Sequence, residues 1–124
     1  MTGIFILEPR PKLAKSTPLE ADSLREVMIA LKNHSLVAWC ERQNTGATKV
    51  GGRFIKFGWK GCSDILGQLK DGRLLAVECK RFKGGKLSDD QILFLERVRK
   101  HGGVSFVATN LHDVFNNLGD LSDR

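Results

Sequence analysis

Apolar residues in the first third of the chain recur at the three- and four-residue spacing of a helix that buries one face. They are Leu24, Val27, Met28 and Leu31. The run Thr17-Pro18-Leu19-Glu20 before them has the residues of a helix start, with a capping hydroxyl, Pro at the first helical position and Glu three residues after the cap. We therefore predict a first helix that ends near Asn33. Residues 1–16 are predicted to form an arm or an edge strand.

Strand-like patterns fill the middle of the chain. Short apolar or alternating runs predict strands at 36–40, 53–57, 64–69 and 73–80. The strand at 53–57 is expected to have one wet, positive side. The stretch 44–52 is rich in Gly, Thr and Asn, which predicts a mobile loop.

Helical signals return in the last third. Ser88-Asp89-Asp90-Gln91 is a second capping box, which predicts a helix to about Lys100 with apolar residues inward at 94, 95 and 98. Gly102 is available for a left-handed cap. A buried strand at 104–108, a short helix at 111–118 and a frayed tail at 119–124 follow. The predicted fold is one α/β domain over 1–124, in the order α-β-β-β-α-β-α, with a central mixed sheet flanked by helices.

Composition agrees with a single folded domain. The chain has 124 residues, within the range of about 100–200 for one domain, and 41% apolar residues exclude wholesale disorder. The net charge is +6, but residues 42–86 carry 11 basic and three acidic residues, a net +8. A basic middle on a near-neutral body is typical of a polyanion-binding face.

Targeting and redox signals are absent from the sequence. The apolar run Ile4–Leu7 is far shorter than the roughly 18 residues of a membrane span, and no basic stretch precedes it as in a secretory signal. The three cysteines form no C-x-x-C pair, so we expect reduced, structural thiols. These features predict a cytoplasmic protein, in the host cell if a virus encodes it, with no membrane association and no small-molecule cofactor.

One group of residues has the composition of a catalytic metal site. Lys80 follows Glu78 at i+2, so their side chains share one face of the predicted strand, and the carbonyl of Cys79 lies between them. Together with Asp64 they would supply two carboxylates and a carbonyl, the hard oxygen ligands that Mg²⁺ prefers. A nearby ammonium can orient a water. Phosphodiester hydrolysis needs these parts.

Strand register decides whether Asp64 can join this group. A two-residue turn would place Asp64 opposite Cys79 and therefore on the face away from Glu78. A three-residue loop, 70–72, places Asp64 opposite Glu78, and it ends in a left-handed residue that Gly72 supplies without strain. We predict the three-residue loop.

An ordered string of motifs surrounds these residues. It runs through Asn44-Thr45-Gly46, Gly52-Arg53-Phe54-Ile55, Gly58-x-x-Gly61-x-Ser63-Asp64-Ile65, Leu75–Lys80, Gly85-Lys86-Leu87-Ser88-x-x-Gln91 and Gly102-Gly103. The string resembles the VRR-NUC branch of the PD-(D/E)XK nuclease superfamily over most of the chain from Glu20 to Val114, in the compact form that bacteriophages encode. Ser63 stands where the superfamily name expects Pro.

The resemblance implies a restriction-endonuclease-like core and a metal-dependent DNA endonuclease. Asp64 and Glu78 would bind Mg²⁺, for which Mn²⁺ would substitute, and Lys80 would be the catalytic cation. Family members of this kind are thought of as homodimers that act on branched DNA such as four-way (Holliday) junctions. Gln91 matches a glutamine that helps to hold a water or the metal, and Glu20 matches an acid near the metal. Each also sits three residues after a predicted helix cap, so both interpretations stay open.

Six cations flank the predicted site and are expected to border one DNA-binding cleft: Arg53, Lys56, Lys60, Arg81, Lys83 and Lys86. A non-catalytic, basic nucleic-acid-binding protein, or a subunit of a phage DNA-processing complex, would share this charge. The paired carboxylates separate the hypotheses, because a pure binder gains nothing from two carboxylates facing a phosphate. For a dimer, the arm Ile4–Leu7 and the segment Asn44–Gly52 are the candidate surfaces.

Overall fold

A computed structural model describes residues 20–43, 46–80 and 85–119, apart from the side chains at 20, 46–48, 56 and 57. Its helices are α1 (Glu20–Lys32), α2 (Asp89–Lys100) and α3 (Leu111–Leu118). Its strands are β1 (Val37–Arg42), β2 (Gly46–Val50), β3 (Arg53–Phe57), β4 (Ile65–Leu69), β5 (Leu74–Cys79) and β6 (Val104–Ala108). The predicted arm and most of the predicted tail lie outside these residues.

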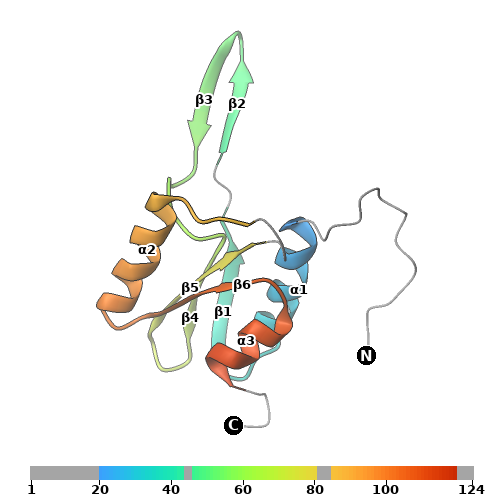
Figure 1. Cartoon of the computed structure of the whole chain (residues 1–124), viewed down its shortest axis with the longest axis vertical. Coiled ribbons are helices and arrows are strands. Elements are labelled where there is room, and N and C mark those ends of the chain that lie inside the picture. The colour runs from blue at the N-terminus through green and yellow to red at the C-terminus, as the bar shows by residue number, and fades with distance from the viewer. Residues whose placement is uncertain (1–19, 44–45, 81–84, 120–124) are drawn as a thin grey trace, which may run out of the picture.

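The strands form two separate sheets (Figure 1). One has four strands in the order β1-β4-β5-β6, and the other consists of β2 and β3 alone. Strands β1, β4 and β5 pair antiparallel, whereas β6 runs parallel to β5. The predicted mixed sheet is therefore confirmed, and its elements follow the order α-β-β-β-α-β-α. The predicted strand 53–57 is not part of this sheet, because as β3 it pairs only with β2 in a hairpin inserted after β1.

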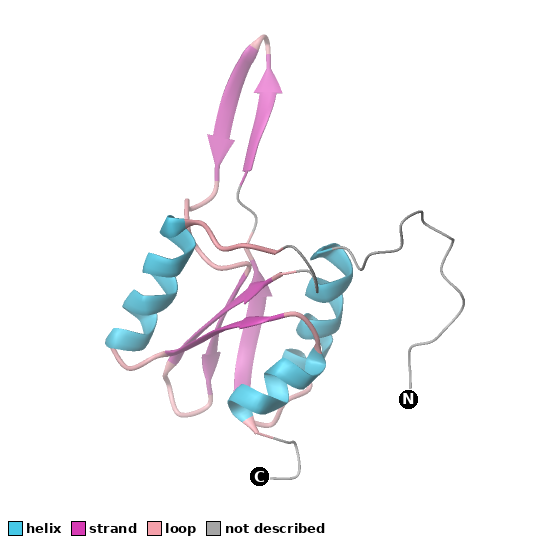
Figure 2. Ribbon diagram, viewed as in Figure 1, coloured by secondary structure: helices cyan, strands magenta, loops and turns pink. Residues whose placement is uncertain are grey.

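Helices cover both faces of the main sheet (Figure 2). Helices α1 and α3 pack on one face, where Val27 and Leu31 are fully buried against Ile65 and Leu75. The four apolar residues predicted from helical spacing thus point into the core or pack against it. Asn110 caps α3 by accepting hydrogen bonds from the backbone N–H groups of the first turn.

Helix α2 covers the other face. Its Phe94, Leu95 and Val98 are buried with Ala76 and Cys62, as the sequence predicts. Ser88 and the third residue of the helix form the predicted capping box. Gly102 takes a φ of +94° directly after the C-cap, the left-handed conformation that glycine adopts without strain. Local sequence signals therefore fix both ends of α2.

The register between β4 and β5 is the predicted one. Ile65 lies opposite Val77 and Gln68 opposite Leu74, and the N–H of Leu69 donates to the carbonyl of Arg73 at 2.9 Å. The three-residue loop between them ends at Gly72, whose φ is +97°. Continued by one pair beyond Ile65 and Val77, this register brings Asp64 beside Glu78, and the backbone N–H of Asp64 donates to a carboxylate oxygen of Glu78.

The segment 44–52 is not the loop that its composition predicted. Residues 46–50 form β2, which pairs with β3 through a two-residue turn in which Gly51 and Gly52 have φ values of +58° and +82°. Two positive φ values in succession are the requirement of a tight hairpin turn, and Gly-Gly meets it. The prediction of one solvent-exposed, positive side on β3 is also wrong, because Arg53 and Phe54 point to opposite sides of the strand and both are exposed, so both sides face solvent.

Among the described residues, Cys40, Cys62 and Cys79 form no disulfide, and all three are buried, which agrees with the prediction of structural thiols. Burial raises the pKa of Cys40 and Cys62, which keeps these thiols protonated. No helix in the described ranges is long and apolar enough to cross a membrane.

Candidate active site

Two carboxylates meet at one end of the main sheet, where β4 begins and β5 ends. Asp64 directly precedes β4, and Glu78 is the penultimate residue of β5. The backbone N–H of Asp64 donates to Glu78 Oε1 at 3.2 Å, and the N–H of Cys79 donates to Asp64 Oδ2 at 2.8 Å. The carboxylate of Glu78 therefore accepts from the backbone of Asp64, and the carboxylate of Asp64 accepts from the residue after Glu78. These two bonds hold the acids side by side.

Glu78 is fully buried although it is ionisable. Removal from water, the negative charge of Asp64 and a hydrogen bond between the carboxyl groups together raise the pKa of Glu78 to about 8, and Lys80 opposes this shift. With no cation bound, Glu78 is therefore mostly protonated at neutral pH. Stability alone does not favour two adjacent carboxyl groups, and strongly perturbed acids cluster at functional sites.

Lys80 and Gln91 both approach the same oxygen of Glu78. Lys80 Nζ lies 3.8 Å from Glu78 Oε2, and Gln91 Nε2 donates to that oxygen at 2.6 Å. The shared strand face predicted for Glu78 and Lys80 is therefore observed. The structure brings together Asp64, Glu78, Lys80 and Gln91, which come from β4, β5 and α2 and the residues next to them.

Gln91 has the capping role that one of its two interpretations predicted, and it also contacts Glu78; its predicted contact with a water or the metal stays a prediction. Its Oε1 accepts a hydrogen bond from the N–H of Ser88 at 2.8 Å, and its own N–H donates to the hydroxyl of Ser88, which completes the capping box. Its Nε2 at the same time reaches Glu78. A side-chain amide has an acceptor end and a donor end, so one residue caps the helix and contacts the acid. The side chain of Glu20 lies outside the described part, so its two interpretations stay open.

The loop between β3 and Asp64 is held against the start of α2. Gly61 has a φ of +83°, and a Cβ there would lie 2.9 Å from the Cβ of Asp90. Lys60 Nζ also lies 3.4 Å from a carboxylate oxygen of Asp90. Ser63, at the position of the superfamily's Pro, is buried and donates to the carbonyl of Ile65. Asp90 was not predicted to position the site, although Gly61 is a local signal of this close approach.

The donor set fits a hard divalent cation. Asp64 and Glu78 offer carboxylate oxygens with two lone pairs each, so an oxygen that accepts a hydrogen bond can also bind a cation. A cation between them would relieve the repulsion that raises the pKa of Glu78. Within residues 20–43, 46–80 and 85–119, no group of three or more His, Cys, Asp and Glu side chains converges on one point. Further ligands would be the carbonyl predicted at Cys79, water and substrate oxygens.

The described side chains among the six predicted DNA-binding cations are all exposed: Arg53, Lys60 and Lys86. The side chain of Lys56 and residues Arg81 and Lys83 lie outside the described residues. Arg53 pairs with Val50 next to the hairpin turn, so it belongs to the projecting hairpin rather than to the wall of a cleft on the main body.

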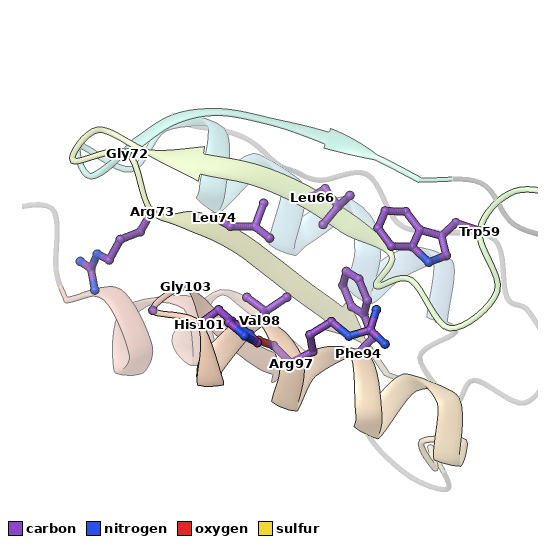
Figure 3. Close-up of a pocket in the computed structure, with 11 residues that line it drawn as sticks. Trp59, Leu66, Gly72, Arg73, Leu74, Phe94, Arg97, Val98, His101 and Gly103 are labelled. Carbon is purple, nitrogen blue, oxygen red and sulfur yellow. The ribbon is translucent and has the colours of Figure 1, made fainter.

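A groove of about 530 Å³ lies between α2 and the β4–β5 hairpin (Figure 3). Trp59 and Phe94 stand at one end of it, with ring centroids 5.2 Å apart in an edge-to-face arrangement, and Arg73 stands at the other. Trp59 is still 53% exposed, so it packs against Phe94 and also presents part of its ring system to solvent. Neither carboxylate of the candidate site lines this groove.

In comparisons with protein-family models, curated proteins and solved structures, no family, protein or structure matches this chain.

Proposed function

We propose that the protein is a metal-dependent DNA endonuclease that hydrolyses phosphodiester bonds. The observation that carries the proposal is the Asp64–Glu78 pair, held on adjacent strands with Lys80 Nζ 3.8 Å from Glu78. These residue types in this geometry are the requirements of metal-assisted phosphodiester hydrolysis. The motif string that resembles VRR-NUC nucleases supports the same activity, and the mixed sheet with helices on both faces supports a restriction-endonuclease-like core.

In this proposal each residue has one chemical task. Asp64, Glu78 and the carbonyl of Cys79 hold Mg²⁺ or Mn²⁺. A cation held there would supply positive charge to the scissile phosphate and would make a bound water more acidic. Lys80 orients the attacking water and stabilises the negative charge of the transition state. Gln91 holds the carboxylate of Glu78 in position, because its amide reaches the acid while its other end is fixed by the capping box.

The non-catalytic alternative accounts less well for this geometry. In a protein that only binds phosphates, the net charge of +8 on residues 42–86 would help binding, but a buried carboxyl group beside a second acid would lower stability without any benefit. Lys80 lowers the pKa of Glu78, but burial and the neighbouring Asp64 outweigh it and leave the pKa near 8. The cost of this pair in stability favours a catalytic role.

The substrate we propose is branched DNA, cut by a homodimer. One chain builds one site, and one site cuts one strand, so paired cuts across a four-way junction require two copies related by a two-fold axis. Light scattering at micromolar concentration should give twice the 13.8 kDa mass of the chain. A strict monomer, both alone and on junction DNA, would remove the paired-cut mechanism. A cytoplasmic location remains part of the proposal.

A cleavage assay tests the activity. Linear, flapped and four-way DNA are incubated with the protein and Mg²⁺ or Mn²⁺, beside an EDTA control. We expect cleavage with either metal, most on the four-way DNA, and none in EDTA. Glu78→Gln should abolish it, whereas the matched control Glu96→Gln, an equal change at an exposed position of α2, should cut as the wild type does. Equal cutting by both variants would reject the assignment of the site.

A further inference from the structure

The β2–β3 hairpin stands apart from the main body (Figure 1). Its two strands pair with each other and with no strand of the main sheet. A two-stranded hairpin has little stability of its own in water. Gly51 and Gly52 fix a tight turn, and a Cβ added at either residue would meet no atom within 4 Å, so the tip is open on all sides.

The tip exposes large apolar side chains. Phe54 is 73% exposed, the highest fraction among the large apolar residues of the described chain, and Val50 is 57% exposed. Phe54 lies opposite Lys49 in the register of the hairpin, with Lys49 Nζ 5.8 Å from the ring centroid. The tip therefore pairs an exposed aromatic ring with a cation.

The charge of the hairpin selects the partner. No acidic residue occurs between Glu41 and Asp64, whereas the hairpin strands contain Lys49, Arg53 and Lys56. A second copy bound through the same surface would place these cations against their own copies, because a two-fold contact is self-complementary. A polyanion would complement the positive charge of the hairpin, and unstacked bases could stack on the ring of Phe54. Nucleic acid has both.

We infer that the hairpin tip is a DNA-probing element in which Phe54 stacks on a base that has lost its neighbour, as at a branch point, while Lys49 and Arg53 contact phosphates. In a continuous duplex an aromatic side chain must first unstack a base step, which costs free energy, whereas a branch point already exposes the face of a base. The inference rests on the proposed function for its DNA substrate and assigns the preference for branched DNA to one residue. The hairpin leaves the sheet directly before the loop that leads to Asp64, at the end that carries the carboxylates.

Binding without cleavage tests the inference. Fluorescence anisotropy in EDTA is measured with a four-way DNA and with a linear duplex of the same sequence. Phe54→Ala should weaken binding to the four-way DNA about tenfold and leave duplex binding unchanged. Phe54→Trp should retain the preference, and Phe54→Leu, which keeps an apolar side chain in the hairpin, should lose it. Val50→Ala is the matched control at the tip and should bind both DNAs as the wild type does.

A fluorescent adenine analogue at the branch point gives a direct readout of stacking. Its emission should change on binding of the wild type and the Trp variant, but not of the Leu variant. If all Phe54 variants bind both DNAs like the wild type, the inference is wrong. It is also wrong if Phe54→Ala changes the mass in solution and not the DNA preference, since the tip is then a protein interface.

The two proposals fail in different ways. A protein that prefers four-way DNA through Phe54 but cuts no DNA with Mg²⁺ or Mn²⁺ would refute the endonuclease and leave the probing element standing. If the protein cuts DNA and its Phe54→Ala variant keeps the preference for four-way DNA, the probing element is refuted and the endonuclease stands.

Discussion

Gln91 and Glu78 are joined by a 2.6 Å hydrogen bond from the side-chain amide to Oε2. The same amide closes the capping box at the start of α2 through its oxygen. The helix start and the candidate site therefore share one side chain, and the position of α2 sets the position of an acid on β5. This link connects a local folding signal to the proposed chemistry.

Two variants separate the roles of this amide. Ser88→Ala removes the capping hydroxyl and should lower stability by about 1 kcal/mol, while DNA cleavage stays near the wild-type rate. Gln91→Glu keeps a capping-box residue but replaces the donor to Glu78 with a carboxylate, so cleavage should fall more than about tenfold. Thermal melts and cleavage rates measured together check this. Equal losses of activity in the two variants would contradict a direct role for the amide.

The raised pKa of Glu78 predicts an unusual pH dependence of stability. The acid titrates near pH 8 in the folded protein and near its ordinary value, about 4.3, when unfolded, so the folded state binds the extra proton between these values. Its contribution is therefore fully present below about pH 4 and is lost as the pH rises through 8. The melting temperature without metal should fall from about pH 5 to about pH 8.5.

Glu78→Gln provides the control for that titration. Its amide cannot ionise, so the fall in melting temperature over the same pH range should be much smaller, and the variant should be more stable than the wild type at about pH 8.5. A divalent cation should raise the melting temperature of the wild type most at high pH, since it binds the ionised acid. A wild type and a variant with parallel pH curves would show that Glu78 does not titrate in this range.

Lys80 should be needed for cleavage but not for metal binding. Lys80→Met keeps most of the apolar stem and removes the charge beside Glu78. We expect cleavage to fall about a hundredfold or more because the transition state loses a cation. The variant should still bind the metal, although at higher pH than the wild type does, because Lys80 lowers the pKa of Glu78. Unchanged cleavage in this variant would remove Lys80 from the site.

Local signals in the sequence predicted the parts of the fold that depend on short-range chemistry. The capping box at Ser88, the left-handed glycines 72 and 102 and the helical spacing of Val27 and Leu31 all act within a few residues, and the structure shows each of them. The loop length at Gly72 fixed the β4–β5 register, so the meeting of Asp64 with Glu78 followed from one turn.

Other features of the fold and the site could not be predicted, either because they depend on residues distant in the chain or because the surrounding composition favoured a different structure. The Gly51–Gly52 turn is a hairpin signal, but the Thr and Asn residues before it favoured a loop. The second hydrogen bond of Gln91 requires α2 to lie beside the end of β5, which no local pattern states. The full burial of Glu78, and with it the raised pKa, likewise depends on packing from several elements.

The central claim is that Asp64 and Glu78 form a divalent cation site, and Mn²⁺ binding measured by titration calorimetry at about pH 8 tests it most directly. We expect one ion per chain for the wild type and for the surface control Glu96→Gln, with affinity that weakens as the pH is lowered from about 8 to about 6 because protons compete for Glu78. Asp64→Ala and Glu78→Ala should each lose that binding while they remain folded by circular dichroism. Wild-type affinity in both alanine variants would contradict the account.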